Sequence, residues 1–144
     1  MFTPSFSYAL GQAGAMAHAY RRVSVETSIV DASPHKLVEM LFDGFMESVS
    51  QARGYMRSGE IESKGKAISR AARIVEEGLK AGLNLKDGGR LALDLQSLYA
   101  YLTMRLTLAN IRNDEKILDE CASLVDPLRQ AWKAIGPQVH QGLN

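Results

Sequence analysis

Apolar residues recur at helical spacing in four consecutive segments, and this recurrence constrains the fold more than any other feature. Three predicted helices span about 33–58, 61–83 and 90–111, and a fourth follows the Asn113-Asp114 turn. Within each segment the apolar residues return every three or four positions, as one face of an α-helix requires. We therefore predict an all-α fold, an antiparallel four-helix bundle with a short N-terminal cap helix or arm.

Serine, glycine and proline residues mark the predicted helix ends. Ser33 can cap the first long helix, Pro34 suits its first position, and Gly59 is a good stop. Pro127 lies inside the fourth helical pattern, where proline removes one backbone hydrogen bond. Because Asp126 and Pro127 also form a cap-and-start pair, we expect a kink or restart near Asp126 and not a lost helix.

The 144 residues fit one domain with one core. Residues 1–15 lack a clean apolar period, so we predict a flexible arm there. We predict the bundle domain at residues 16–136 and a frayed tail at residues 137–144. No Lys or Arg precedes Arg21, and no apolar run reaches the length of a membrane span. We expect a soluble cytoplasmic protein without membrane insertion.

Composition and spacing argue against several classes of function. The net charge of +1 disfavours a phosphate-binding surface, so we expect no nucleic-acid partner. The single cysteine, Cys121, is interpreted as a small core residue. The Glu-x-x-His pairs of a di-iron bundle, Cys-x-x-Cys motifs and phosphate-binding loops are missing. We therefore expect no catalytic residue, cofactor or metal, and no enzyme.

His35 raises one alternative, because histidine phosphotransfer modules are also four-helix bundles. Their motif places lysine three residues and glycine four residues after the histidine, where this chain has Val38 and Glu39. His35 also falls on the first helical turn. We interpret it as a surface histidine near a cap and keep phosphotransfer as the weaker alternative.

The third helix carries more apolar surface than one bundle position needs. One stripe suffices for the core and consists of Leu91, Leu95, Leu98, Leu102, Leu106 and Ala109. A second set lies on nearly the opposite face, at spacing close to a coiled-coil seam. We call this second set the outer seam: Leu93, Ser97, Tyr101, Met104 and Leu108.

Three occupants could cover the outer seam. They are the N-terminal arm, a second copy of the chain, and the amphipathic helix of a partner. Burying a leucine or methionine side chain is worth about 1.5–3 kcal/mol relative to exposure, so cover is favoured. The arm could also be a removable lid, which makes the first and third occupants compatible.

Three blocks in order resemble the family of the flagellar secretion chaperone FliS. They are an Ala-Ser-Pro cap followed by LVEMLFDG at 37–44, LQSLYAYL at 95–102, and LRQAW at 128–132. The resemblance covers Tyr20 to about Ile135, and Phe42 replaces the family's usual tyrosine. It implies a cofactor-free chaperone that binds the disordered C-terminal region of flagellin in the cytosol. It also implies that the chaperone blocks premature polymerisation and presents flagellin to the flagellar type III export apparatus.

The resemblance and the outer seam together suggest partner-binding residues. We expect flagellin contacts at the outer seam, a lid near the N-terminus, and one side chain that bonds an exposed client backbone group. The residues in that order are Leu93, Tyr101, Met104 and Leu108; Tyr20 and Val23; and Asn110. The second and fourth helices could equally supply the groove. A scaffold that dimerises weakly through the outer seam remains the alternative.

Overall fold

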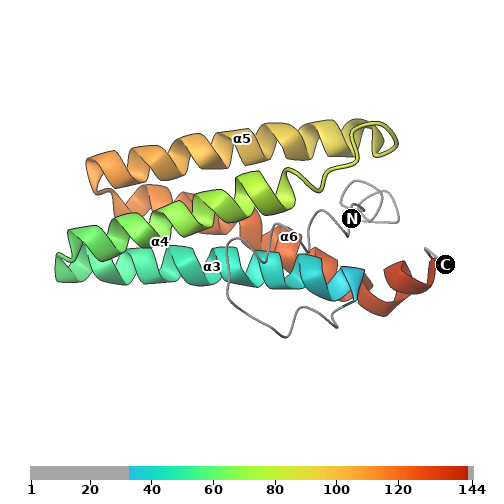
Figure 1. Cartoon of the computed structure of the whole chain (residues 1–144), viewed down its shortest axis with the longest axis horizontal. Helices are drawn as coiled ribbons and strands as arrows, with labels where there is room; N and C mark the ends of the chain where they lie inside the picture. Colours follow the sequence, from blue (N-terminus) through green and yellow to red (C-terminus); the bar gives the residue numbers. More distant parts are fainter. Residues whose placement is uncertain (1–32, 143–144) are drawn as a thin grey trace.

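The computed structural model describes residues 33–142, with side chains described to residue 136. Within these residues the helices are α3 (Pro34–Ser58), α4 (Ile61–Arg73) with its π-helical continuation η2 (Ile74–Leu79), α5 (Gly89–Arg112) and α6 (Glu115–Gly142). They run side by side and consecutive helices are antiparallel (Figure 1). The predicted all-α bundle is confirmed. The arm at 1–15 and the segment with Tyr20 and Val23 lie outside the described residues.

The helix ends follow local rules read from the sequence. The Ser33 hydroxyl accepts a hydrogen bond from the Lys36 backbone N–H at 3.1 Å, and Pro34 occupies the first helical position. Gly59, with a φ of 72°, closes α3 in the left-handed conformation that glycine adopts without strain. Asn113 closes α5 in the same way, with a φ of 51°.

The second predicted helix differs from the structure in its last turns. Helical structure stops at Leu79, short of the predicted end at residue 83. In η2 the helical turns are wider than in an α-helix, and the Lys80 N–H donates to the Val75 carbonyl, five residues earlier, at 2.7 Å. Gly78 lies against α3, where an added Cβ would sit 2.9 Å from a Leu41 methyl carbon. The missing side chain at Gly78 therefore permits the close approach of η2 to α3.

The fourth helix is longer and more continuous than the sequence predicts. α6 passes through Pro127 without a restart at Asp126 and continues beyond residue 136, where fraying was predicted, to Gly142. The Asp126 carboxylate accepts side-chain hydrogen bonds from Arg129 at 3.0 Å and Gln130 at 2.7 Å, so it bonds along the helix surface. Because Pro127 is exposed, water can satisfy the carbonyl that lacks a helical partner.

Every helix contributes to one core. The largest fully buried side chains include Phe42 and Phe45 of α3, Ile74 of η2 and Tyr99 of α5. Cys121 of α6 is fully buried, and this burial raises the pKa of its thiol to about 11. Cys121 is therefore the core residue that the sequence predicts. Within residues 33–142, no helix is long and apolar enough to cross a membrane.

Candidate functional site

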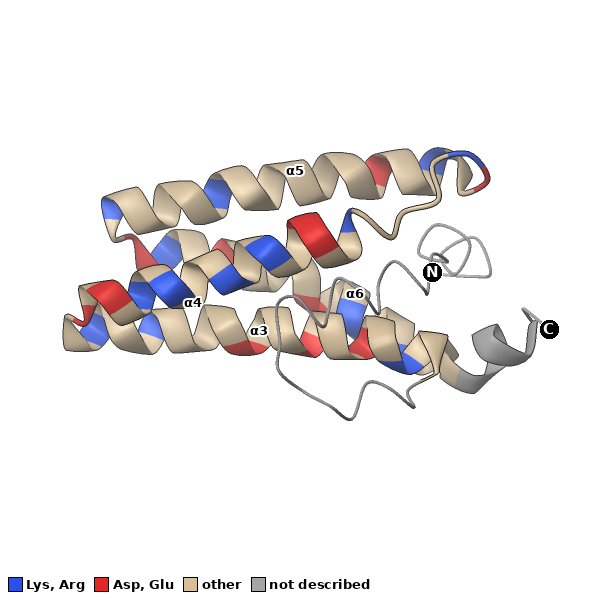
Figure 2. Ribbon diagram, in the orientation of Figure 1, with Lys and Arg blue, Asp and Glu red and all other residues tan. Residues whose placement is uncertain are grey.

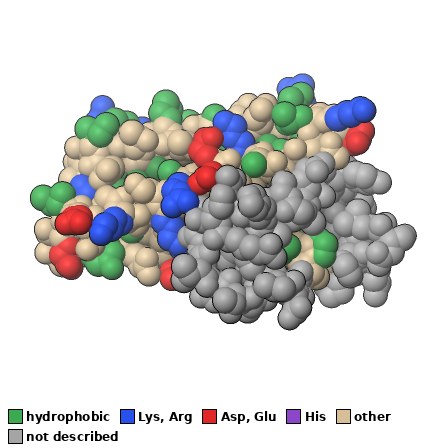
Figure 3. Space-filling model, in the orientation of Figure 1, with side chains coloured by type: hydrophobic (Ala, Val, Ile, Leu, Met, Phe, Trp, Pro, Cys, Tyr) green, Lys and Arg blue, Asp and Glu red, His purple; other side chains and the backbone are tan. Residues whose placement is uncertain are grey.

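The outer seam stays outside the bundle core. Leu93 is 52% exposed, Tyr101 37% and Met104 57%, and Ser97 is also exposed. Leu108 differs, because it is half-buried and packs against the core. Hydrophobic side chains stand on the surface along the upper edge of the molecule, where α5 runs (Figure 3). The bundle thus hides one face of α5 and leaves a second apolar face accessible.

The buried face of α5 is turned slightly from the predicted stripe. Leu95, Leu102 and Leu106 are buried as expected, whereas Leu91 and Leu98 are only half-buried. Ala92 and Tyr99 are fully buried instead. This rotation leaves the outer seam near the centre of the solvent face.

Ile111 extends the outer seam and was missed from the sequence. Its side chain is 75% exposed, and at about 100° per residue it lies about 20° from Met104 around the helix. The signal was present, because Ile111 follows Leu108 by three residues and so continues the same spacing. The apolar face therefore reaches from Leu93 to the last turn of α5.

Tyr101 forms a fixed edge of the outer seam toward α6. Its hydroxyl donates to the Glu120 carboxylate at 2.5 Å, and the Arg105 guanidinium donates to the same carboxylate at 2.7 Å. Arg105 also lies 5.9 Å from the Tyr101 ring centroid. The hydrogen bond from Tyr101, followed by that from Arg105, holds the pKa of Glu120 below its usual value. These bonds hold the tyrosine ring in one orientation.

Asn110 lies on the other side of the seam, in an open groove between α4 and α5. The groove encloses about 520 Å³ and is lined on α4 by residues that include Gly65, Lys66 and Arg73. The Asn110 carbonyl accepts a hydrogen bond from the Lys64 ammonium at 3.1 Å. Since Lys64 is only 5% exposed, this buried bond fixes Asn110 against α4. The structure therefore places Asn110 beside basic residues that the sequence reading did not select.

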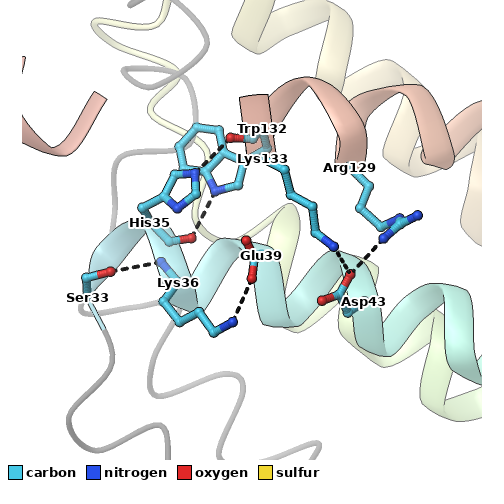
Figure 4. Close-up of polar contacts among 8 residues, drawn as sticks. All are labelled: Ser33, His35, Lys36, Glu39, Asp43, Arg129, Trp132 and Lys133. Atoms are coloured by element: carbon cyan, nitrogen blue, oxygen red, sulfur yellow. Dashed lines mark hydrogen bonds and ion pairs between the residues drawn. The ribbon is translucent and has the colours of Figure 1, made fainter. Parts of the chain in front are cut away.

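His35 is not the surface histidine that we predicted. Its ring is half-buried and stacks on Trp132 of α6, with ring centroids 4.9 Å apart and an interplanar angle of 11°. The His35 Nε2 atom donates to the Trp132 carbonyl at 2.7 Å, and the Trp132 indole N–H donates to the His35 carbonyl at 2.9 Å (Figure 4). We call this stack, with its two hydrogen bonds, the His35–Trp132 clasp. Phosphorylation at Nε2 would break the bond to the Trp132 carbonyl, which argues against phosphotransfer.

The first and last sequence blocks of the family resemblance meet at the interface between α3 and α6. Besides the clasp, Asp43 of α3 pairs with Arg129 at 3.2 Å and with Lys133 at 3.6 Å, both on α6 (Figure 4). These contacts fasten α3 to α6 and lie on different residues from the outer seam. Within the described side chains, no cluster of His, Cys, Asp and Glu could hold a metal ion.

Comparison with known proteins gives one consistent result. The family model described as "Flagellar protein FliS" matches residues 16–139. The chain is 44% identical over 120 residues to the flagellar secretion chaperone FliS of Salmonella typhimurium, covering 83% of this chain and 89% of that protein. It is 40% identical to the flagellar secretion chaperone FliSB of Pseudomonas aeruginosa, and the match covers 81% of this chain and 91% of that protein. It is 30% identical to FliS of Bacillus subtilis, with 80% of this chain and 81% of that protein covered.

The family model spans most of the chain. Each of the three relatives is named a flagellar secretion chaperone, and this chain covers at least 81% of its length. They are named as chaperones and not as enzymes, which agrees with the sequence prediction. The chain belongs to the FliS family of flagellar secretion chaperones.

Proposed function

We propose that this chain is a cytosolic export chaperone for flagellin. In this proposal the outer seam of α5 binds the disordered C-terminal region of flagellin and keeps it from polymerising too early. The chaperone then delivers flagellin to the flagellar type III export apparatus. Family membership supports the role in flagellar secretion, and the exposed apolar face of α5 supports a protein client.

The observation that carries the proposal is the exposure of Leu93, Met104 and Ile111 on one face of an otherwise packed helix. A disordered client loses conformational entropy when it folds on a surface, so it needs a long apolar contact in return. The seam runs over most of α5 and meets this need. Tyr20 and Val23, outside the described residues, remain proposed lid residues.

The test introduces negative charge at two of the exposed seam positions and measures client binding. Leu93→Asp/Met104→Asp should abolish binding of a flagellin C-terminal segment in calorimetry, because a carboxylate would be buried in an apolar interface. The matched control is Ser123→Asp/Ala134→Asp, which adds the same charge at two exposed positions of α6. Helical circular dichroism should be unchanged in both variants. Wild-type affinity in the seam variant would remove the seam from the site.

The same exposed face also suits a second copy of the chain, which is the competing proposal. A scaffold would dimerise through Leu93 and Met104 whether or not a client is present. Light scattering of the free chain, with and without the flagellin segment, separates the two. A chaperone should bind the client as a monomer, and a weak dimer should dissociate as the client binds. A dimer that persists and excludes the client favours the scaffold.

A further inference from the structure

Tyr101 lies at the border of the outer seam that faces α6. Its ring is exposed on the seam, and its hydroxyl donates to the Oε2 atom of Glu120 at 2.5 Å. The hydroxyl therefore has a partner within the chain, on a different helix from the seam itself. What Tyr101 offers to a client is its apolar ring, and α6 holds the polar end of that ring.

Both carboxylate oxygens of Glu120 are engaged. Oε2 accepts from Tyr101, and Oε1 accepts from the Arg105 guanidinium at 2.7 Å. Tyr101 and Arg105 are one turn apart on α5, so a single side chain of α6 binds two successive turns of that helix. Hydrogen bonds to an ionised group are stronger than those between neutral groups. The arrangement therefore fixes the carboxylate and the tyrosine hydroxyl together.

Arg105 is an isolated charge beside an apolar face. Charged positions are sparse along α5 (Figure 2), and in the sequence Arg105 is the only charged residue between Asp94 and Arg112. At about 100° per residue it lies about 40° beyond Tyr101 around the helix. A partner that covers the seam displaces water near this cation, which costs free energy unless the cation is paired. Glu120 supplies that pair.

The tyrosine hydroxyl controls how freely the ring moves. An aromatic side chain on a helix has two common χ1 rotamers, and an exposed ring can exchange between them. Immobilising such a side chain when a partner packs on it weakens binding by about two- to tenfold. The hydrogen bond between Tyr101 and Glu120 already selects one orientation, so a client that packs on this ring meets less of that cost.

We propose that Glu120 is a positioning residue for client binding. It holds the Tyr101 ring in the orientation on which the client packs, and it acts through that ring without touching the client. The inference rests on the proposed function, because it takes the outer seam as the client's site. It adds that α6 takes part in a surface built on α5, and that the client places an apolar side chain opposite Tyr101.

The test is a double-mutant cycle on affinity for the flagellin C-terminal segment, measured by calorimetry. Tyr101→Phe keeps the ring and removes its hydroxyl, whereas Glu120→Ala removes the acceptor, and each should weaken binding by about threefold or more. Because both changes break one hydrogen bond, the double variant should bind no more weakly than Glu120→Ala alone. Independent roles would instead multiply the two losses, to about ninefold or more, and that result would overturn the inference.

The matched control is Glu115→Ala, which also removes an acidic side chain of α6 that pairs with an arginine, Arg57 of α3. The side chains of Glu115 and Glu120 are similarly exposed, at 30% and 35%, but Glu115 lies outside the seam. The control should bind the segment within about twofold of wild type.

A fluorine NMR signal reports the ring directly, with 3-fluorotyrosine in place of Tyr101. Its chemical shift should move toward that of the free amino acid in Glu120→Ala and stay unchanged in Glu115→Ala. If Glu120→Ala leaves the shift unchanged, or weakens binding no more than Glu115→Ala does, the inference fails. If Leu93→Asp/Met104→Asp still abolishes binding, the proposed function survives that failure; if this seam variant also binds like wild type, both fail.

Discussion

Gly78 provides a sharp test of the packing between η2 and α3. Replacing Gly78 by alanine would place its Cβ at 2.9, 3.2 and 3.6 Å from three side-chain carbons of Leu41. Because Leu41 is fully buried, it cannot turn away without disturbing the core. Overpacking of this kind costs about 1–3 kcal/mol, and alanine returns up to about 1 kcal/mol of helix propensity. We predict a net loss of up to about 2 kcal/mol, and in any case no stabilisation.

Gly54 supplies the matched control, because an added Cβ there meets no atom within 4 Å. Gly54→Ala in the interior of α3 should stabilise the chain by about 0.5–1 kcal/mol. Urea titration followed by circular dichroism measures both variants. Leu41→Val should lessen the cost of Gly78→Ala when the two are combined. If Gly78→Ala stabilises the chain as much as Gly54→Ala does, the contact with Leu41 is not tight and the reasoning is wrong.

Three further predictions concern buried polar groups and pH. The Tyr99 hydroxyl is buried and has no hydrogen-bond partner among the residues that the structure describes, so Tyr99→Phe should keep or raise the free energy of unfolding, by about 1 kcal/mol. A clear loss in urea titration would contradict this. Lys64 donates two hydrogen bonds to acceptors at the end of α5. Lys64→Met should lower the free energy of unfolding by about 1–2 kcal/mol, because it leaves those acceptors unpaired. An unchanged thermal unfolding temperature would show that water replaces the ammonium. Hydrogen bonds from Tyr101 and Arg105 lower the pKa of Glu120, so the folded chain binds this proton more weakly than the unfolded chain. The resulting stability is present above the ordinary pKa of 4.5 and is lost as the pH falls through the lower folded pKa. Glu120→Gln should therefore reduce the fall in the free energy of unfolding at acidic pH. An unchanged fall would refute the assignment.

The fold was predictable because its signals are local. The capping serine at Ser33, the left-handed glycine at Gly59 and the three-to-four-residue apolar period each act within one or two turns. The outer seam was predictable for the same reason, since one helix shows both of its faces in its own sequence. The exposure of Leu93 and Met104 confirms that part of the reading.

What escaped prediction depends on pairs that are distant along the chain. The clasp of His35 with Trp132 joins residues 97 positions apart, and no local pattern marks it. The close approach of η2 to α3 at Gly78 depends on the position of Leu41 across the core. The groove beside Asn110 depends on how α4 and α5 lie together, so Lys66 was not recognised as a neighbour of Asn110.

The outer seam of α5 is the proposed binding site of the client. Site-specific photo-cross-linking tests it most directly, with a benzophenone amino acid replacing Met104 in one variant and the exposed Ser123 of α6 in another. On irradiation with the flagellin C-terminal segment, the variant at Met104 should form a covalent adduct and the variant at Ser123 should not. An adduct formed at Ser123 but not at Met104 would place the client on another face and contradict the account.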